Sequence, residues 1–252
     1  MKFYKTIEMH FYFGSNYFPD KPKSLDEVIR MMEARCIEKN IMMNYLCLYG
    51  DFRIGNTELF EAIQAYRELY GYCYINGHYL EDSKSQMLEF LPEEKCRGIK
   101  FHPEYSGLRP NDKRVLPLFE KLAYEYDKPA LIHSWPYGEH GNPQPYSHPS
   151  FIVELAKNLP KLKIIMGHMG GPSWLETIEI AKPYSNVYLD MQGSYTYFDK
   201  VKAAVDALGA DRVMFGSGGS FDTQLGVVYD SEISDDDRKK VLYGTAKKVF
   251  DL

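Results

Sequence analysis

The strongest constraint on the fold is a regular alternation between two kinds of segment along the whole chain. Short apolar or β-branched runs end in polar residues, and longer amphipathic runs follow them. This alternation is typical of βα units and a parallel sheet. Strands are expected at residues 4–10, 43–48, 72–75, 98–101, 130–132, 163–166, 186–189 and 212–215.

Helices are expected between these strands, and local signals support several of their ends. Ser24 and Glu27 have the spacing of a capping box before the first helix. Asn56 is a candidate N-cap of the second helix, Gly71 follows its expected end, and Pro149 suits the first turn of the fifth. The helices are expected at about 25–40, 57–70, 83–90, 112–126, from 149, at 173–182, at 198–208 and after 234.

Eight such units predict either a closed (β/α)8 barrel or a doubly wound open sheet. No glycine-rich phosphate loop follows the first strand, which weakens the dinucleotide-binding alternative. A length of 252 residues is usual for one barrel. The sequence therefore predicts an α/β fold, a TIM barrel, as a single domain over residues 1–252.

Composition excludes several classes of protein. The net charge is −5 and no basic block is present, which argues against a nucleic-acid partner. No apolar stretch approaches the roughly 18 residues of a membrane span, and residues 1–20 lack the pattern of a secretory signal. None of the four cysteines forms a C-x-x-C pair, so reduced thiols in a cytoplasmic protein are expected. The expected partners are a small-molecule substrate and a second copy in a homodimer.

Polar residues gather at the carboxyl ends of the expected strands, the face that holds the active site of a (β/α)8 barrel. Five of the seven histidines lie there, and the opposite strand ends carry no such set. Core packing therefore does not explain the pattern. The residues, in chain order, are His10, Tyr12, Asp51, His78, Lys100, His102, His133, His168, Asp190, Ser217 and Gly218.

Single members of this set have simpler explanations. His78 and His102 are more often hydrogen-bonded surface residues than ligands, Lys100 could be a salt-bridge partner, and Asp190 could cap a loop. His10, His133 and His168 differ, because they follow three separate strands and point into one mouth. They are predicted to share a site.

Several segments from residue 98 onward resemble successive blocks of the amidohydrolase superfamily. The blocks are GIKFHP (98–103), PALIHSW (129–135), KIIMGHMGG (163–171), NVYLDMQG (186–193) and VMFGS (213–217), and YGTAKKVF (243–250) resembles the closing segment. The likeness is greatest to the branch that contains aminocarboxymuconate-semialdehyde decarboxylase and related decarboxylases and hydrolases. It covers nearly the whole chain in the right order.

The resemblance implies one divalent metal, held by an H-x-H pair after the first strand, by histidines after the fifth and sixth, and by an aspartate after the eighth. His10 matches the first histidine of the pair, and His133 matches the strand-five ligand. His168 matches the strand-six histidine, which in decarboxylase-like members resembles a catalytic acid/base. Two positions depart from the pattern: Tyr12 stands at the second histidine and Gly218 at the aspartate.

The two departures weaken the expected metal site. A phenol with a pKa near 10 is a poor zinc ligand, and glycine offers no side chain. A Zn²⁺ or Mn²⁺ ion held by His10, His133 and His168 is therefore expected to be weakly bound or absent. Ordinary metal-assisted hydrolysis is also disfavoured, because the carboxylate that would activate water is missing.

Three interpretations stay open. The first is an amidohydrolase-like enzyme, a hydrolase or a decarboxylase (lyase), with His168 as acid/base and Tyr12 as proton donor. The second is a non-catalytic barrel that binds a ligand in the same place. The third is that Gly218 is an introduced residue.

The substrate is expected to be small, carboxylated or aromatic. Lys100, His102, Trp135 and Asp190 are the candidate substrate-binding residues, with Arg53 and Arg109 as further partners for a carboxylate. Aromatic residues in the loops that should rim the mouth support an apolar, planar ligand; they are Tyr17, Phe18, Tyr105, Trp135, Tyr137, Trp174, Tyr195 and Tyr197.

Overall fold

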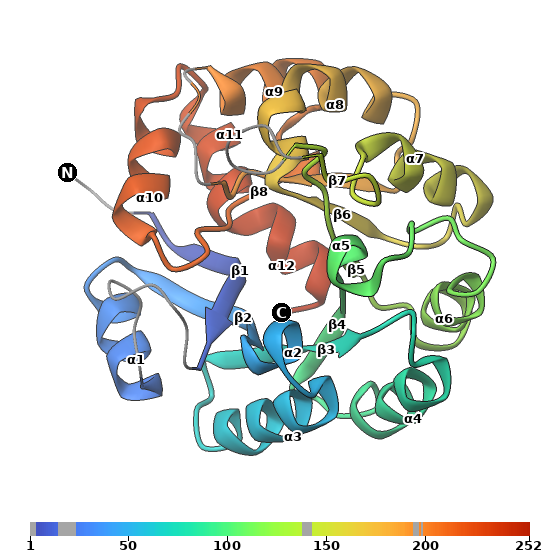
Figure 1. The fold of residues 1–252 in the computed structure, drawn as a ribbon. Helices are drawn as coiled ribbons and strands as arrows, with labels where there is room; N and C mark the ends of the chain where they lie inside the picture. Colours follow the sequence, from blue (N-terminus) through green and yellow to red (C-terminus); the bar gives the residue numbers. More distant parts are fainter. Residues whose placement is uncertain (1–3, 15–23, 138–142, 194–196, 198) are drawn as a thin grey trace.

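The computed structural model describes residues 4–14, 24–137, 143–193, 197 and 199–252. Within them, eight parallel strands follow one another in sequence order around a barrel, with helices on the outside (Figure 1). This confirms the predicted (β/α)8 fold. The strands are β1 (Thr6–Phe13), β2 (Ile37–Asn44), β3 (Leu69–Ile75), β4 (Cys96–Phe101), β5 (Ala130–His133), β6 (Ile164–Gly167), β7 (Val187–Asp190) and β8 (Val213–Met214).

The barrel closes between its last and first strands. The backbone N–H of Met9 donates to the Phe215 carbonyl at 3.3 Å, and Gly218 N–H donates to the His10 carbonyl at 2.8 Å. The residues that follow β8 therefore lie directly against the strand that carries His10.

The helices cover the outer face of the sheet, and α12 packs against inward-facing strand residues. Ala246, Val249 and Phe250 of α12 share a buried cluster with Met9 and Leu131. The helices are α1 (Leu25–Glu33), α2 (Leu46–Tyr49), α3 (Phe52–Ile63), α4 (Leu80–Phe90), α5 (Pro103–Ser106), α6 (Leu116–Lys121), α7 (Pro149–Asn158), α8 (Trp174–Ala181), α9 (Lys200–Leu208), α10 (Phe221–Asp230), α11 (Asp235–Lys239) and α12 (Thr245–Phe250). π-Helical turns continue α6 and α11, at Leu122–Tyr126 and Lys240–Gly244.

Several local predictions are confirmed and others are wrong. Ser24 accepts a hydrogen bond from the Glu27 N–H, and Pro149 opens α7. The second strand was placed too late: it begins at residue 37, and the expected strand at 43–48 ends in the short helix α2. Asn56 is not an N-cap but a buried residue inside α3, and Gly71 lies in β3.

A bulge in β1 sets the direction of the His10 side chain. The pairing register with β2 shifts between Glu8 and Phe11. Met9 packs in the cluster inside the barrel, whereas Phe11 packs in the outer core between strands and helices. An extra residue between them changes the alternation of side chains, as bulges near active sites commonly do. The carboxyl of Glu8 accepts the His10 N–H at 2.8 Å, which satisfies a backbone donor at the bulge.

The described residues contain no helix that is long and apolar enough to cross a membrane. The four cysteines are free thiols, as expected, and three of them are buried.

Asn56 generates a prediction about stability, because its side chain joins α3 to β3 and α4. Its Nδ2 donates to the Tyr74 carbonyl at 3.0 Å and to Gln86 Oε1 at 2.9 Å, and its Oδ1 accepts the Tyr74 N–H at 2.8 Å. Replacing Asn56 with Ala leaves these buried partners without a hydrogen bond and should lower the free energy of unfolding by about 2–4 kcal/mol. Urea denaturation measures this. Asn111→Ala, which removes an exposed contact to Glu154, is the control and should cost less than about 1 kcal/mol; equal losses would contradict the prediction.

Candidate active site

Four strands bring the predicted site residues to one end of the barrel. His10 lies on β1, Lys100 on β4, His133 ends β5 and His168 directly follows β6. All four side chains are buried or nearly so, with Lys100 and His10 fully inaccessible. His10, His133 and His168 therefore lie together in the structure, as predicted. Their chemical roles stay predictions.

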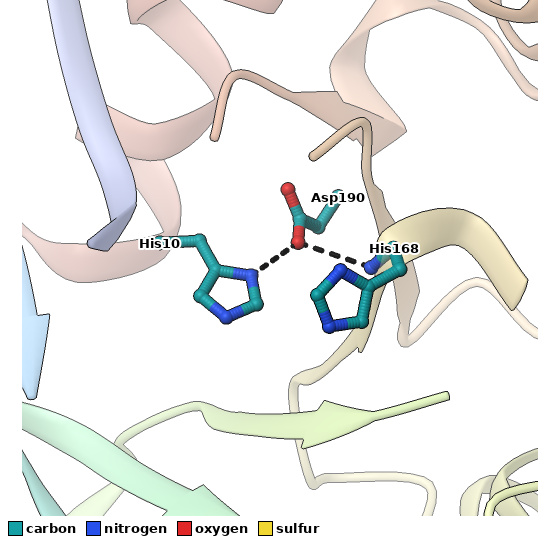
Figure 2. A group of neighbouring side chains, drawn as sticks. All are labelled: His10, His168 and Asp190. Carbon is teal, nitrogen blue, oxygen red and sulfur yellow. Dashed lines mark hydrogen bonds and ion pairs between the residues drawn. The ribbon is translucent and has the colours of Figure 1, made fainter. Parts of the chain in front are cut away.

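Asp190, at the end of β7, fixes both His10 and His168. Its Oδ2 lies 2.5 Å from His10 Nδ1 and accepts the backbone N–H of His168 at 3.1 Å (Figure 2). Its Oδ1 accepts the Gln192 N–H at 2.9 Å. Both oxygens are thus engaged by the protein and fully buried. In the structure Asp190 lies behind His10, where it orients the imidazole; its predicted contact with substrate stays a prediction.

The other nitrogen of His10 faces two polar groups. Its Nε2 lies 3.1 Å from Lys100 Nζ and 3.0 Å from the Tyr12 hydroxyl. Because Asp190 accepts from Nδ1–H, Nε2 carries the lone pair and accepts from one or both of these groups. Lys100 Nζ also lies 5.9 Å from the centre of the Tyr12 ring. The Lys100 ammonium is therefore positioned by His10 and Tyr12 together.

His133, His168 and His102 form a second part of the site. His168 Nε2 and His133 Nδ1 are 2.8 Å apart and share a hydrogen bond. The His102 ring stacks on His133 with centroids 3.8 Å apart, and His133 Nε2 lies 3.3 Å from Gln144 Oε1. The Nδ1 atoms of His168 and His102 are buried and have no hydrogen-bond partner among the residues that the structure describes. Two imidazole nitrogens are thus left for another molecule to bond.

Burial controls the protonation of these groups. It lowers the pKa of His102, His133 and His168 well below the usual value, and the charge of Lys100 adds to the effect. Burial also lowers the pKa of Lys100 to about 7, although Asp190 opposes the change. For Asp190 itself, burial raises the pKa, but His10 and the hydrogen bonds outweigh burial and leave a net lowering.

Glu8 adds a second carboxyl close to the site, which the sequence analysis did not single out. Its Oε1 accepts the N–H groups of His10 and Ser217, and Oε2 has no hydrogen-bond partner among the described residues. Burial raises the pKa of Glu8 to about 8, so that it is mostly neutral at pH 7. At neutral pH the site therefore holds one ionised carboxylate, that of Asp190, and Lys100, which with a pKa of about 7 is charged in about half of the molecules. The only sequence signal for Glu8 was its place two residues before His10.

A strained turn presents His168. His168 and Met169 have φ angles of 61° and 50°, in the left-handed region that residues with a Cβ rarely adopt. The two glycines that follow are required by packing: a Cβ at Gly170 would lie 1.9 Å from Thr177 Oγ1, and one at Gly171 would lie 2.5 Å from the Trp135 ring. The GHMGG segment is thus a turn that holds His168 against Trp135, at 5.4 Å between ring centres.

Aromatic contacts form a closed circuit around these groups. Tyr12 stacks on Tyr45 at 4.8 Å, Tyr49 contacts Tyr105 at 5.5 Å, and Tyr105 contacts His102 at 4.4 Å. Tyr49 and Tyr105 are 51% and 44% exposed, so the circuit reaches the surface. We call this set the aromatic circuit; its members, in order of contact, are His10, Tyr12, Tyr45, Tyr49, Tyr105, His102, His133 and His168.

The predicted rim and carboxylate-binding residues fall into four groups. Tyr105 and Trp135 contact site histidines, as described above, whereas Trp174 packs against Tyr197 at 6.2 Å. Arg53 pairs with Asp51 and Asp82, and Arg109 lies over the Phe151 ring, so both guanidinium groups are already engaged away from the histidines. Tyr17, Phe18 and Tyr195 lie outside the described residues. Tyr45 is not among the predicted site residues because it lies in the segment that was expected to be a strand, residues 43–48.

The donor atoms test whether the family's divalent metal fits this site. Among the described residues, His10, His168 and Asp190 offer ligand atoms within 4.8 Å of one another. Two donors about 2.1 Å from a tetrahedral ion lie about 3.4 Å apart, whereas His10 Nδ1 and Asp190 Oδ2 are 2.5 Å apart, so an ion would have to bind His10 through Nε2, which already faces Lys100 and Tyr12. His133 and His168 are similarly hydrogen-bonded, at 2.8 Å. These groups satisfy one another, and the metal site of the family does not fit them.

Gly218 supports the same conclusion. Its φ angle is +58°, and an added Cβ would lie 2.4 Å from Gln192 Nε2. The position after β8 therefore has no carboxylate, and the amide end of the Gln192 side chain occupies the place that a Cβ would take. The nearby Asp222 does not replace it, because Asp222 lies in α10 and pairs with Arg35 at 2.5 Å.

Comparison with known proteins places the chain in a family. A family model described as amidohydrolase matches residues 55–252. No curated protein sequence matches significantly.

Solved structures share the whole fold at low sequence identity. A 2,6-dihydroxybenzoate decarboxylase from Rhizobium is 15% identical, with a TM-score of 0.77 and 98% of each chain covered. A 5-carboxyvanillate decarboxylase from Novosphingobium aromaticivorans, complexed with manganese and 4-hydroxy-3-methoxy-5-nitrobenzoic acid, is 18% identical, with a TM-score of 0.78 and 99% of this chain and 96% of that chain covered. An uncharacterised TIM-barrel protein from Bordetella bronchiseptica is 19% identical, with a TM-score of 0.79 and 98% of each chain covered.

The buried histidines predict a pH dependence of stability. The folded pKa of His102 lies well below the usual 6.5, so between the two values the unfolded chain binds a proton that the folded chain does not. Stability is therefore full above about pH 6.5 and is lost as the pH falls below it. His102→Phe should reduce the slope of unfolding free energy against pH, between pH 5 and 6.5, by up to about 1.4 kcal/mol per pH unit. Urea denaturation at several pH values measures the slope, and an unchanged slope would contradict a neutral His102.

The surroundings of Gly218 predict the effect of adding a side chain. Gly218→Ala suffers both the left-handed backbone and the contact with Gln192 and should cost about 2–4 kcal/mol. Gly107→Ala is the matched control, since Gly107 has a φ of +56° and an added Cβ there meets only the end of one side chain, His78 Nε2 at 3.2 Å; it should cost about 1–2 kcal/mol. Adding Gln192→Ala to Gly218→Ala should recover part of the difference in a thermal melt. Equal losses at the two glycines would show that Gln192 does not fill this space.

Proposed function

We propose that this chain, which belongs to the amidohydrolase family, is an enzyme that removes the carboxyl group from a small aromatic acid. The observation that carries this proposal is the combination of one buried cation, Lys100, with the hydrogen-bonded imidazoles of His133 and His168 inside the aromatic circuit. A carboxylated aromatic ligand needs a cation, a proton carrier and flat apolar walls, and all three occur together here.

Lys100 supplies the partner for the substrate's carboxylate. Its ammonium is fully buried and faces His10 and Tyr12, so a carboxylate bound there would form a charge-assisted hydrogen bond in a site with little water. The rings of Tyr12 and Tyr45 would pack against the aromatic part of the ligand, with His102 and Trp135 as further contacts. The decarboxylases with the same fold act on hydroxylated aromatic acids, which agrees with this class.

His168 is the proposed acid/base. A bound carboxylate favours the charged imidazolium, which opposes the effect of burial on the pKa of His168. His168 can then deliver a proton to the ring carbon that carries the carboxylate. The bond between that carbon and the carboxylate breaks, its electron pair restores the aromatic ring, and carbon dioxide leaves. Tyr12, hydrogen-bonded to His10, is the second proton donor near the substrate.

Hydrolysis is the less supported reaction. A hydrolase of this family needs a carboxylate to activate water, and Gly218 provides none. A barrel that only binds its ligand is also less supported, because binding alone does not require a strained turn that presents His168.

The proposal uses no metal. A Zn²⁺ or Mn²⁺ ion held by His10, His133 and His168 follows from the family resemblance, but the hydrogen bonds among these groups do not support it. A homodimer, the absence of a nucleic-acid partner and a cytoplasmic location remain predictions from the sequence.

Removal of the imidazole of His168 tests the reaction. His168→Gln should lower turnover by about 10²-fold or more, the usual size of a lost acid/base contribution. The assay incubates the protein with 2,6-dihydroxybenzoate, 5-carboxyvanillate and related aromatic acids and follows the decarboxylated product by chromatography. His148→Gln is the matched control, because His148 is partly exposed at the start of α7.

Two results would overturn parts of the proposal. Unchanged turnover in His168→Gln would remove His168 from the mechanism. Neither binding nor turnover of any aromatic acid by the unmodified protein would mean that the substrate class is wrong.

A further inference from the structure

Lys100 lies against the two residues that stand at ligand positions in the family pattern. The resemblance assigns the strand-one ligand pair to His10 and Tyr12, and Lys100 contacts both. Its Nζ is 3.1 Å from His10 Nε2, the nitrogen that Asp190 leaves unprotonated, and 5.9 Å from the centre of the Tyr12 ring. The side chain is fully buried on β4, so solvent does not reach the ammonium.

An ion and the ammonium could not share this position. A divalent ion bound to His10 Nε2 lies about 2.1 Å from that nitrogen, and Lys100 Nζ is 3.1 Å from the same atom. The ion and the ammonium would then lie within about 5 Å of each other, and like charges so close in a site of low dielectric constant repel by several kcal/mol. One positive group therefore excludes the other unless Lys100 moves away or loses its proton.

The charges of the site balance with the lysine and not with a metal. The nearby carboxylates are Asp190, whose two oxygens bond to the protein, and Glu8, which lies in the seam between β1 and the residues after β8. The carboxylate expected after β8 is absent at Gly218, and Tyr12 replaces an imidazole with a phenol. One ammonium is matched by Asp190, whereas a divalent ion added to it would leave a buried excess of positive charge.

We infer that the Lys100 ammonium takes the place of the family's metal ion and supplies, without a metal, the positive charge that holds the substrate's carboxylate. The inference rests on the proposed function for the class of ligand, but the part that concerns the metal is independent of it. Lys100 donates hydrogen bonds to the carboxylate oxygens, while His10, held by Asp190, keeps the ammonium in position.

A second buried lysine provides a matched control. Lys200 is 3% exposed, and its Nζ donates to the Met191 carbonyl at 2.7 Å. It has no hydrogen bond to any of the site imidazoles within the described part of the chain. If removing any buried ammonium weakens ligand binding, both Lys100→Met and Lys200→Met will show the effect. If binding depends on the group that bonds the ligand's carboxylate, only Lys100→Met will show it.

The first experiment measures metal. The full-length protein, purified without chelator or added metal, is analysed for its elements and then melted with EDTA, Zn²⁺ or Mn²⁺. We expect much less than one ion per chain and the same melting temperature in all three conditions. One ion per chain, with a lower melting temperature after EDTA, would overturn the inference whatever the substrate is.

The second experiment measures binding of 2,6-dihydroxybenzoate by calorimetry in EDTA. The unmodified protein should bind, and Lys100→Met should weaken binding by about 10–100-fold, the value of a hydrogen bond to a charged group. Lys200→Met should bind like the unmodified protein. If Lys100→Met does not fold, Lys100→Gln, which keeps a polar end, replaces it.

The outcomes separate the two proposals. Equal binding in Lys100→Met and the unmodified protein, or a need for added metal, would overturn the role of Lys100. No binding by the unmodified protein would refute the proposed substrate class, and the metal content would then decide alone whether Lys100 replaces the ion.

Discussion

The buried carboxylate of Asp190 joins three parts of the chain that meet at the site. It bonds to the ring of His10 on β1, to the backbone of His168 after β6 and to the backbone of Gln192 beyond its own strand. These contacts orient one imidazole and hold in place the strained turn that presents the other. Because the group is fully buried and ionised, each of these bonds is stronger than it would be in water.

The same carboxylate makes a buried lysine tolerable. An isolated ammonium inside a barrel is costly, and the pKa of Lys100, lowered by burial to about 7, reflects that cost. Asp190 opposes the lowering, although the imidazole of His10 lies between the two charges. Carboxylate, imidazole and ammonium thus form one hydrogen-bonded chain. Asp190 sets the tautomer of His10 at Nδ1, and Lys100 donates to the lone pair of His10 at Nε2.

The sequence predicted the barrel and the meeting of the histidines, because both follow from the alternation of segments and from the residues at strand ends. The prediction placed the second strand too late, since α1 ends at Glu33 and the turn into β2 passes through Cys36, which has a φ of +56° without being glycine. The bulge in β1 depends on Glu8 satisfying a backbone donor, and the buried Asn56 depends on partners in two other elements. Such tertiary hydrogen bonds have no signal in a single sequence.

The two departures from the family pattern lie on either side of one residue, which explains why they occur together. Gly218 donates its N–H to the carbonyl of His10, and Tyr12 hydrogen-bonds to the ring of His10. A side chain at Gly216 would also meet His10 Cβ, at 2.9 Å, so the chain after β8 packs closely against β1. His10 is thus fixed by hydrogen bonds and packing on every side that the structure describes. A metal ligand must instead keep one nitrogen free for the ion, and in this barrel that nitrogen faces the ammonium of Lys100.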